Sequence, residues 1–153
     1  MANTYTQIYI QYVFAVQNRV SLINENWQPD LYKYMTGIIE HQEHKLFSIN
    51  GMPDHVHILI SMNPMQAPSD LMYHVKRSSS LWINENKLCP GKFSWQEGFG
   101  AFSYGKSQIP TIANYIENQK SHHLKKSFIE EYTGFLKAFG IEYDDRYIYK
   151  PID

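Results

Sequence analysis

The sequence of 153 residues contains a single cysteine, Cys89, and this scarcity excludes two classes of protein. One cysteine forms neither an intrachain disulfide nor a cysteine-rich zinc cluster, so a reducing compartment is expected. Glycine and proline are also few, with 8 and 7 residues spread along the chain, which excludes collagen-like and linker compositions. An excess of one charge is missing too, because 14 basic and 15 acidic side chains leave a net charge of −1.

Long hydrophobic runs are absent from the sequence. The longest apolar stretches, residues 8–16 and 56–62, are far shorter than the ~20 residues that a membrane span needs. The first seven residues lack the charged and then apolar segments of a secretory signal. We therefore expect a cytoplasmic protein without a membrane partner. A hydrophobic fraction of 43% with 19% charged residues indicates a single folded domain over residues 1–153.

The spacing of apolar residues predicts strands interleaved with helices. Strands are expected over residues 6–16, 45–50, 55–62, 93–95 and 101–104, and helices over residues 28–43, 68–86, 110–123 and 128–139. The main order of strand, helix, strand, strand, helix, strand is the β-α-β-β-α-β pattern of ferredoxin-like folds. We predict an α+β protein whose antiparallel sheet carries helices on one face, with further helices at the C-terminus.

Two histidines separated by one residue form the first candidate site. Residues i and i+2 of a strand point to the same face, so His55 and His57 would project side by side while Val56 faces the other way. Neutral imidazole is the commonest nitrogen ligand of metal ions, and the pair could hold one. Such a pair also occurs by chance, so the spacing alone leaves a purely structural role open.

Tyr115 and Gln119 form the second candidate site. They stand four residues apart in an expected helix and would therefore share one face, bringing a phenol and an amide oxygen together. The same spacing is also typical of an ordinary helix whose tyrosine packs on the core.

Several segments together resemble the single-tyrosine HUH transposases of small bacterial insertion sequences, the IS-two-hundred group, and their repeat-associated relatives. The most specific are the sequence PDHVHILI at 53–60 and the sequence YIENQ at 115–119, which is followed by His122 and His123. The other matching segments are residues 12–19, 74–79, 95–103, 128–132 and 140–143. The resemblance covers nearly the whole chain.

This resemblance implies a DNA transposase that cleaves and rejoins single-stranded DNA through a covalent 5′-phosphotyrosine. Tyr115 would be the nucleophile, and His55, His57 and Gln119 would bind Mg²⁺ or Mn²⁺. A homodimer and single-stranded DNA with hairpins at the element ends are the implied partners. The ligand set is neutral and incomplete, so an ion would keep its positive charge and open positions for a phosphate. The sequence has no match to a phosphate-binding GxxxxGK[ST] loop, and no nucleotide cofactor is expected.

Basic side chains are concentrated in one stretch of the sequence. Residues 71–126 hold 8 basic and 3 acidic side chains, against 6 and 12 in the rest of the chain, which hints at a surface facing a polyanion. Within it we expect Lys76, Arg77, Lys106 and Lys120 to contact DNA.

Three other functions stay open at this point. One is a domesticated relative that binds hairpin DNA without transposition. Another is a small-molecule metal enzyme that uses His55 and His57 but does not need Tyr115. A replication or conjugation nickase would use the same chemistry, although such proteins are usually larger than 153 residues.

Overall fold

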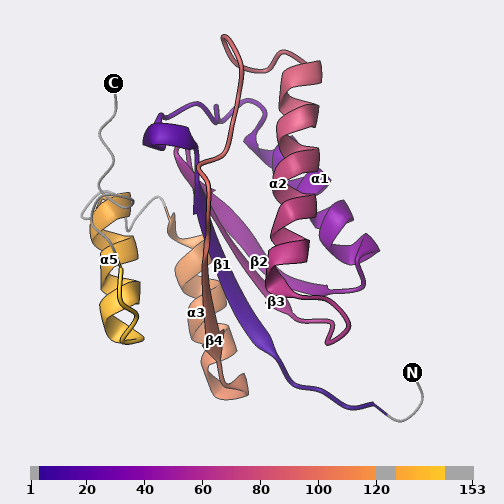
Figure 1. Ribbon diagram of the computed structural model, residues 1–153, viewed down its shortest axis with the longest axis vertical. Coiled ribbons are helices and arrows are strands. Elements are labelled where there is room, and N and C mark those ends of the chain that lie inside the picture. Colours follow the sequence, from indigo (N-terminus) through magenta and orange to yellow (C-terminus); the bar gives the residue numbers. More distant parts are fainter. Residues whose placement is uncertain (1–3, 120–126, 144–153) are drawn as a thin grey trace.

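The computed structural model describes residues 4–119 and 127–143 (Figure 1). Its elements follow in the order β1 (Tyr9–Ala15), η1 (Gln17–Arg19), α1 (Gln28–His41), β2 (Lys45–Met52), β3 (His55–Ser61), α2 (Pro68–Glu85), β4 (Gly100–Tyr104), η2 (Lys106–Gln108), α3 (Ile109–Glu117) and α5 (Phe128–Ala138). The elements from β1 to β4 confirm the predicted β-α-β-β-α-β pattern, and α3 and α5 are the expected C-terminal helices.

Four strands form one antiparallel sheet in the order β2-β3-β1-β4. The two central strands, β3 and β1, pair along their whole length, with His57 opposite Val13. Pro53 and Asp54 form the turn between β2 and β3. A Cβ at Gly51 would lie 2.1 Å from the carbonyl oxygen of His55, so this position of the hairpin requires glycine. The hairpin thus fixes the start of β3, where the two histidines lie.

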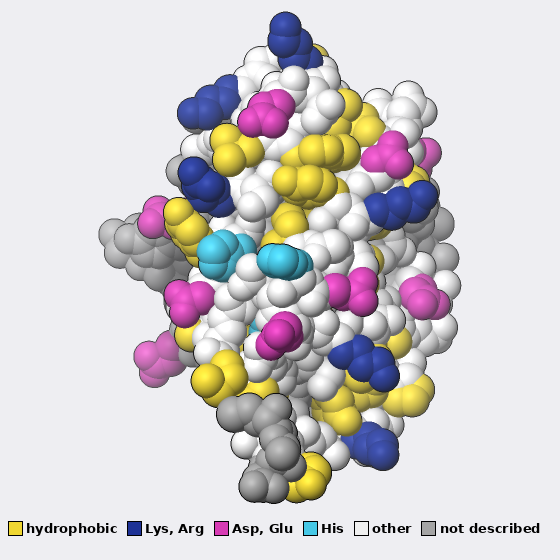
Figure 2. All heavy atoms as spheres, turned by 90° about the vertical axis from the view of Figure 1, so that its right-hand side faces the viewer, with side chains coloured by type: hydrophobic (Ala, Val, Ile, Leu, Met, Phe, Trp, Pro, Cys, Tyr) yellow, Lys and Arg dark blue, Asp and Glu magenta, His cyan; other side chains and the backbone are white. Residues whose placement is uncertain are grey.

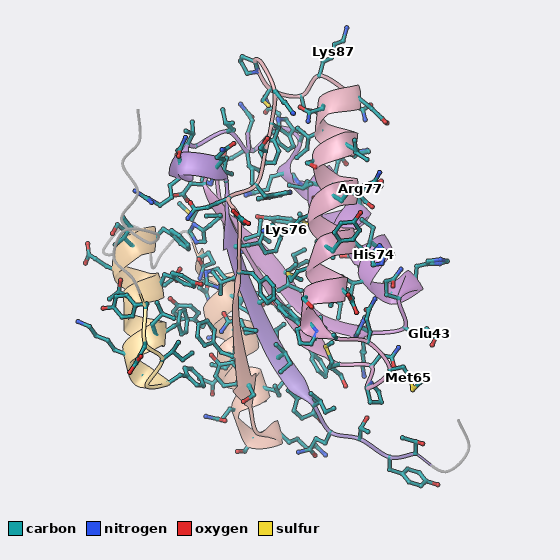
Figure 3. All side chains as sticks on the ribbon, in the orientation of Figure 1. Glu43, Met65, His74, Lys76, Arg77 and Lys87 are labelled. Carbon is teal, nitrogen blue, oxygen red and sulfur yellow. The ribbon has the colours of Figure 1, made fainter. Side chains whose placement is uncertain are left out.

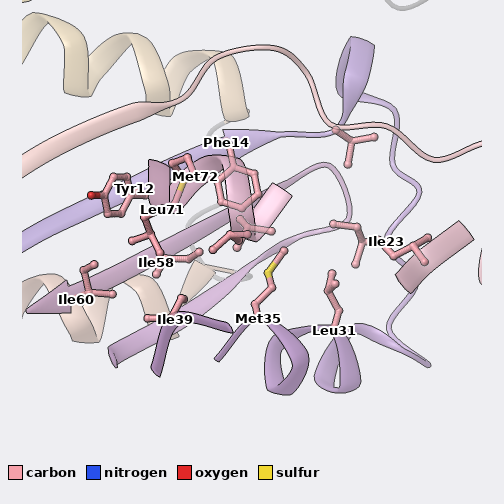
Figure 4. Close-up of a cluster of buried hydrophobic side chains, with 14 of the residues drawn as sticks. Tyr12, Phe14, Ile23, Leu31, Met35, Ile39, Ile58, Ile60, Leu71 and Met72 are labelled. Carbon is pink, nitrogen blue, oxygen red and sulfur yellow. The ribbon is translucent and has the colours of Figure 1, made fainter. Parts of the chain in front are cut away.

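One face of the sheet is covered by α1 and α2 (Figure 1). Alternate residues of β3, Val56, Ile58 and Ile60, are fully buried against this layer. Leu31 from α1 and Leu71 from α2 pack into the same cluster, which Figure 4 shows in close-up. This cluster is the larger hydrophobic core. We call the side of the sheet that it covers the apolar face.

The opposite face of the sheet is covered by α3 and α5 (Figure 1). A smaller hydrophobic cluster joins β1 and β4 to α5, and its members include Val13, Phe102, Phe128 and Leu136. Beside that cluster lie the buried polar side chains Gln11, His55 and His57. We call this side of the sheet the polar face.

One predicted strand is wrong. Residues 93–95 make a single bridge, from Trp95 to Val16, instead of a strand. Side chains of α2 hold this segment instead. Asn84 donates from Nδ2 to the carbonyl oxygen of Phe93 and accepts at Oδ1 from the Phe93 N–H. The indole nitrogen of Trp95 donates to the Ser79 hydroxyl. The backbone groups at Phe93 are therefore satisfied without a second ladder.

Several element boundaries differ from the expected ones. The opening strand begins at Tyr9 instead of residue 6, and β2 continues to Met52. Helix α3 ends at Glu117, and residues 120–123 of the predicted helix lie outside the described residues. None of the helices in residues 4–119 and 127–143 combines the length and the apolar composition of a membrane-spanning segment.

Candidate active site

Strand β3 places the two histidines side by side on the polar face. Their ring centroids are 5.1 Å apart, and neither side chain is exposed to solvent. Val56, between them, packs into the apolar face as the alternation of a strand requires. The structure therefore brings His55 and His57 together as the sequence predicts.

The Nδ1 atom of each histidine faces an acceptor outside the pair. His55 Nδ1 lies 2.7 Å from Asp54 Oδ1, and His57 Nδ1 lies 2.9 Å from Gln11 Oε1. A carboxylate and an amide oxygen only accept, so Nδ1 donates in both cases. Gln11 itself donates to the hydroxyl of Tyr104 at 2.8 Å. These contacts direct both Nε2 atoms toward the same interior point.

Helix α3 brings the tyrosine and the glutamine to that point. The Asn50 side chain of β2 donates to the carbonyl oxygen of Glu117, which holds the end of α3 on the sheet. Gln119 follows α3 and is fully buried, with Oε1 3.2 Å from His55 Nε2. Tyr115 is half-buried, and its ring centroid lies 6.2 Å from that of His57. All four residues expected at the site thus gather within one chain.

A fifth side chain, Glu131 of α5, lies at the centre of this group. Its Oε1 is 2.9 Å from His57 Nε2 and 3.4 Å from His55 Nε2. Its Oε2 accepts hydrogen bonds from the Tyr115 hydroxyl and, at 3.2 Å, from Gln119 Nε2. The carboxylate therefore contacts every side chain of the expected site, and it is 5% exposed.

The packing of α5 determines where Glu131 points. Phe128 stacks near His55 with ring centroids 4.5 Å apart, and Phe135 stacks on Phe102 at 5.3 Å. Tyr132 sits over Gly100, where a Cβ would lie 2.7 Å from its ring. Phe128, Glu131, Tyr132 and Phe135 share one helix face because they are spaced by three, four and seven residues. The aromatic contacts therefore turn the carboxylate into the sheet.

Burial and hydrogen bonding shift two pKa values at the site. Burial alone would lower the pKa of His55, but hydrogen bonds with Asp54 and Glu131, and their charges, raise it to about 9. Burial, followed by the hydrogen bond and charge of Glu131, raises the pKa of Tyr115 well above its usual value. Tyr115 is therefore a neutral phenol in this arrangement.

The side chains around this point suit a divalent cation. His55, His57 and Glu131 each offer one ligand atom, and these atoms all lie within 4.8 Å of one another. Both imidazoles are oriented through Nδ1 by a neighbouring oxygen, which is the usual arrangement of metal-ligating histidines. Nitrogen and oxygen donors without thiolate suit a divalent cation of hard or borderline character.

The basic residues expected to contact DNA lie in different surroundings. Lys76 donates to the carbonyl oxygens of Gln96 and Gly98, each at 2.8 Å, and so holds the loop before β4. Arg77 is exposed on α2, across the sheet from Tyr115, and Figure 3 labels both basic residues of this helix. Lys106 is exposed in η2, directly before the tyrosine helix. Lys120 lies outside the described residues.

The outer surface of α1 and α2 carries charges of both signs. Figure 2 shows Lys and Arg side chains interspersed with Asp and Glu on this face, around a group of hydrophobic side chains. Tyr34 of α1 and Trp82 of α2 stack here with centroids 5.2 Å apart. The face is not a continuous basic surface of the kind that tracks a nucleic-acid backbone.

Sequence reasoning missed Glu131, Asp54 and Gln11 as members of the site. A signal for Glu131 is nevertheless present. It stands three residues after Phe128 and four before Phe135, so an acidic residue falls within the apolar stripe of a helix. Gln11 has a weaker signal, as a polar residue in an otherwise apolar strand. Asp54 follows the turn residue Pro53, and an aspartate at such a position is typical of a turn, so the sequence gives no signal of a role at the site.

Comparisons with known proteins identify a family for this chain. The family model described as "Transposase IS200 like" matches residues 4–119. Among curated proteins, none matches the chain.

Two solved structures share the fold. A crystal structure of a candidate transposase from Deinococcus radiodurans R1 superposes with a TM-score of 0.60 at 18% identity, covering 76% of this chain and 94% of the other. The structure of a REP-associated tyrosine transposase bound to a REP hairpin superposes with a TM-score of 0.61 at 13% identity. The match covers 79% of this chain and 72% of the other. At such low identity the two structures support the fold alone.

Proposed function

The chain belongs to the family of IS200-like transposases, and we propose that it cleaves and rejoins single-stranded DNA through a covalent bond to Tyr115. The observation that carries the proposal is the meeting of Tyr115, His55, His57 and Gln119 at one buried point. The family match alone does not identify the nucleophile. The geometry supports Tyr115 because its hydroxyl contacts a group that also contacts both histidines.

The proposed cleavage step exchanges one phosphate ester for another. The Tyr115 oxygen attacks the phosphorus of a phosphodiester and forms a 5′-phosphotyrosine, while the bond to the 3′ oxygen breaks. The proton that leaves the phenol balances the proton gained by the released 3′ hydroxyl. Attack by a 3′ hydroxyl of DNA reverses the exchange and joins strands. The ester linkage keeps the energy of the broken bond, so the reaction needs no nucleotide cofactor.

His55 and His57, with Gln119, would hold Mg²⁺ or Mn²⁺ in this reaction. A bound divalent ion supplies Lewis-acid stabilisation of the charge that develops on the phosphoryl oxygens. The chain's own contribution is orientation. Asp54 and Gln11 fix the two rings, and the packing of α3 on β2 fixes the tyrosine.

The proposal also makes demands on substrate access and on oligomeric state. Both histidines are fully buried beneath α3 and α5, so side chains that cover them, such as Phe128, have to move before a phosphate reaches them. A homodimer remains part of the proposal, although the cluster in this structure draws all its side chains from one chain. Single-stranded DNA with hairpins is the proposed substrate, and the REP-hairpin complex of a structural neighbour supports this class.

The test is the capture of the covalent intermediate. The protein is incubated with single-stranded DNA carrying the sequences that flank its gene, with Mg²⁺ or Mn²⁺, and adducts are detected by denaturing gel and mass spectrometry. We expect an adduct on Tyr115 that disappears with chelator and in the Tyr115→Phe variant. Tyr132→Phe is the matched control, because Tyr132 lies on α5 over Gly100 and should leave the adduct intact.

Other outcomes would contradict the proposal. Hairpin binding without any adduct would favour the domesticated binding protein. Metal-dependent activity that survives Tyr115→Phe would favour a different metal enzyme.

A further inference from the structure

We propose that Glu131 is a ligand of the divalent ion, so that the metal centre consists of two histidines and a carboxylate together with Gln119. The inference rests on the metal site of the proposed function and changes its composition. The sequence predicts a neutral set of two imidazoles and one amide, whereas the structure brings an acidic side chain into the same space.

The first argument is the spacing of the donor atoms. Adjacent ligands of an octahedral ion with bonds of about 2.1 Å lie about 3 Å apart. Glu131 Oε1 lies 2.9 Å from His57 Nε2 and 3.4 Å from His55 Nε2. Gln119 Oε1 lies 3.2 Å from His55 Nε2. The four donor atoms come from β3, from α5 and from Gln119 beyond α3, and these three distances match the separations of neighbouring ligands around one centre.

The second argument is the cost of burying this carboxylate. Buried charges are paired or coordinate metals, because desolvation without compensation is expensive. Glu131 is buried on a helix face that packs against aromatic rings, and its Oε1 faces both imidazoles. A divalent ion between Oε1 and the Nε2 atoms would compensate the carboxylate and use both imidazoles in their neutral form.

The third argument is the division of labour between the two carboxylate oxygens. Oε1 faces the histidines, whereas Oε2 accepts from the Tyr115 hydroxyl and from Gln119 Nε2. The same side chain can therefore bind an ion through one oxygen and hold the nucleophile through the other. A histidine pair with one carboxylate is also an established ligand set for octahedral divalent ions.

The inference can be tested by Mn²⁺ binding to the full-length protein without DNA. Free Mn²⁺ is followed by electron paramagnetic resonance, and the heat of binding by calorimetry. We expect Glu131→Gln to weaken Mn²⁺ binding by about 10-fold or more, since even indirect partners of metal ligands are worth about 10- to 100-fold. Glu130→Gln is the matched control, because Glu130 is the exposed neighbour on the same helix, and it should stay within twofold.

Two further variants keep the result interpretable. Glu131→Asp retains the charge on a shorter side chain and covers the case in which Glu131→Gln does not fold, as judged by circular dichroism. We expect it to weaken binding as well. His57→Ala tests the metal site itself and should abolish stoichiometric binding.

Two results would overturn the inference or its basis. If His57→Ala abolishes binding while folded Glu131 variants bind Mn²⁺ within twofold of the wild type, or more tightly, Glu131 only covers the site. If His57→Ala also has no effect, the metal site of the proposed function is wrong.

Discussion

Strand β3 presents two unlike surfaces from alternate residues. Val56 and Ile58 face α1 and α2 and contact other hydrophobic side chains. His55 and His57 face α3 and α5 and contact amide and carboxylate groups. All four side chains are 0% exposed, so the two faces differ in chemistry and not in burial.

The two faces are expected to contribute differently to the free energy of folding. Each fully buried aliphatic side chain contributes about 1.5–3 kcal/mol relative to exposure. A buried hydrogen bond contributes about 1 kcal/mol net, because it replaces bonds to water. The apolar face therefore carries the larger part of the folding free energy. The polar face can then hold side chains whose arrangement serves a reaction.

The largest expected effect comes from removing side-chain volume from the apolar face. Ile58→Ala should lower the free energy of unfolding by about 2–5 kcal/mol, through lost burial and a remaining cavity. Urea denaturation measures this loss. The folded fraction of the variant should still bind Mn²⁺ with unchanged affinity, because Ile58 points away from the histidines. A matching loss of affinity would mean that the faces are coupled.

The free energy of unfolding should depend on pH through His55 of the polar face, because its pKa is raised in the folded state. The folded-state pKa of His55 is raised from 6.5 to about 9, so its stabilising contribution is complete below pH 6.5 and is lost as pH rises through 9. The metal-free protein should lose on the order of a few kcal/mol of stability across this window, at about 1.4 kcal/mol per pKa unit. Urea midpoints at several pH values measure it. Asp54→Asn should flatten the dependence, and an equally steep curve would contradict the assignment.

Neighbouring residues of β1 allow a matched comparison of metal affinity. Gln11 faces His57, whereas the Tyr12 hydroxyl donates to Met62 Sδ on the other side. Gln11→Leu removes the oxygen that orients His57 and should weaken Mn²⁺ binding by about 10-fold. Tyr12→Phe should leave the affinity unchanged. Calorimetry measures the Mn²⁺ affinity of both variants. Equal affinities in the two variants would argue against a role for the Gln11 contact.

The smallest effect is expected outside both faces, at Gly37 in α1. Gly37 is exposed, and an added Cβ would meet no atom within 4 Å. Gly37→Ala should stabilise the protein by about 0.5–1 kcal/mol, because glycine is unfavourable within a helix. A thermal melt should show a small rise in Tm with unchanged Mn²⁺ affinity. A fall in Tm would contradict the open surroundings of this position in the structure.

The two faces also differ in how far the sequence predicts them. The apolar face follows from periodicity, because Val56, Ile58 and Ile60 alternate along β3 and apolar residues repeat at helical spacing in α1 and α2. The order of elements from β1 to β4 follows from the same patterns. Residues 93–95 were wrongly predicted as a strand because aromatic composition does not reveal that Asn84 would satisfy their backbone.

The polar face is predicted only where a motif is local. The His-x-His pair and the spacing of Tyr115 and Gln119 are visible in the sequence, and the structure brings these side chains together. Glu131 contributes to the same cluster, but no local pattern connects it to His57, which lies 74 positions earlier. Its role depends on how α5 packs against the sheet, which is a tertiary property.

The large separations along the chain also bear on the order of folding. His57 lies 46 positions after Gln11 and 74 before Glu131, and contacts between such distant residues form late because loop closure costs entropy. The cluster can therefore exist only after the sheet, α3 and α5 have assembled. A nascent or partly unfolded copy would lack the contacts that hold Tyr115, the proposed nucleophile, beside the histidines. The proposed cleavage of DNA would thus become possible only with the last steps of folding.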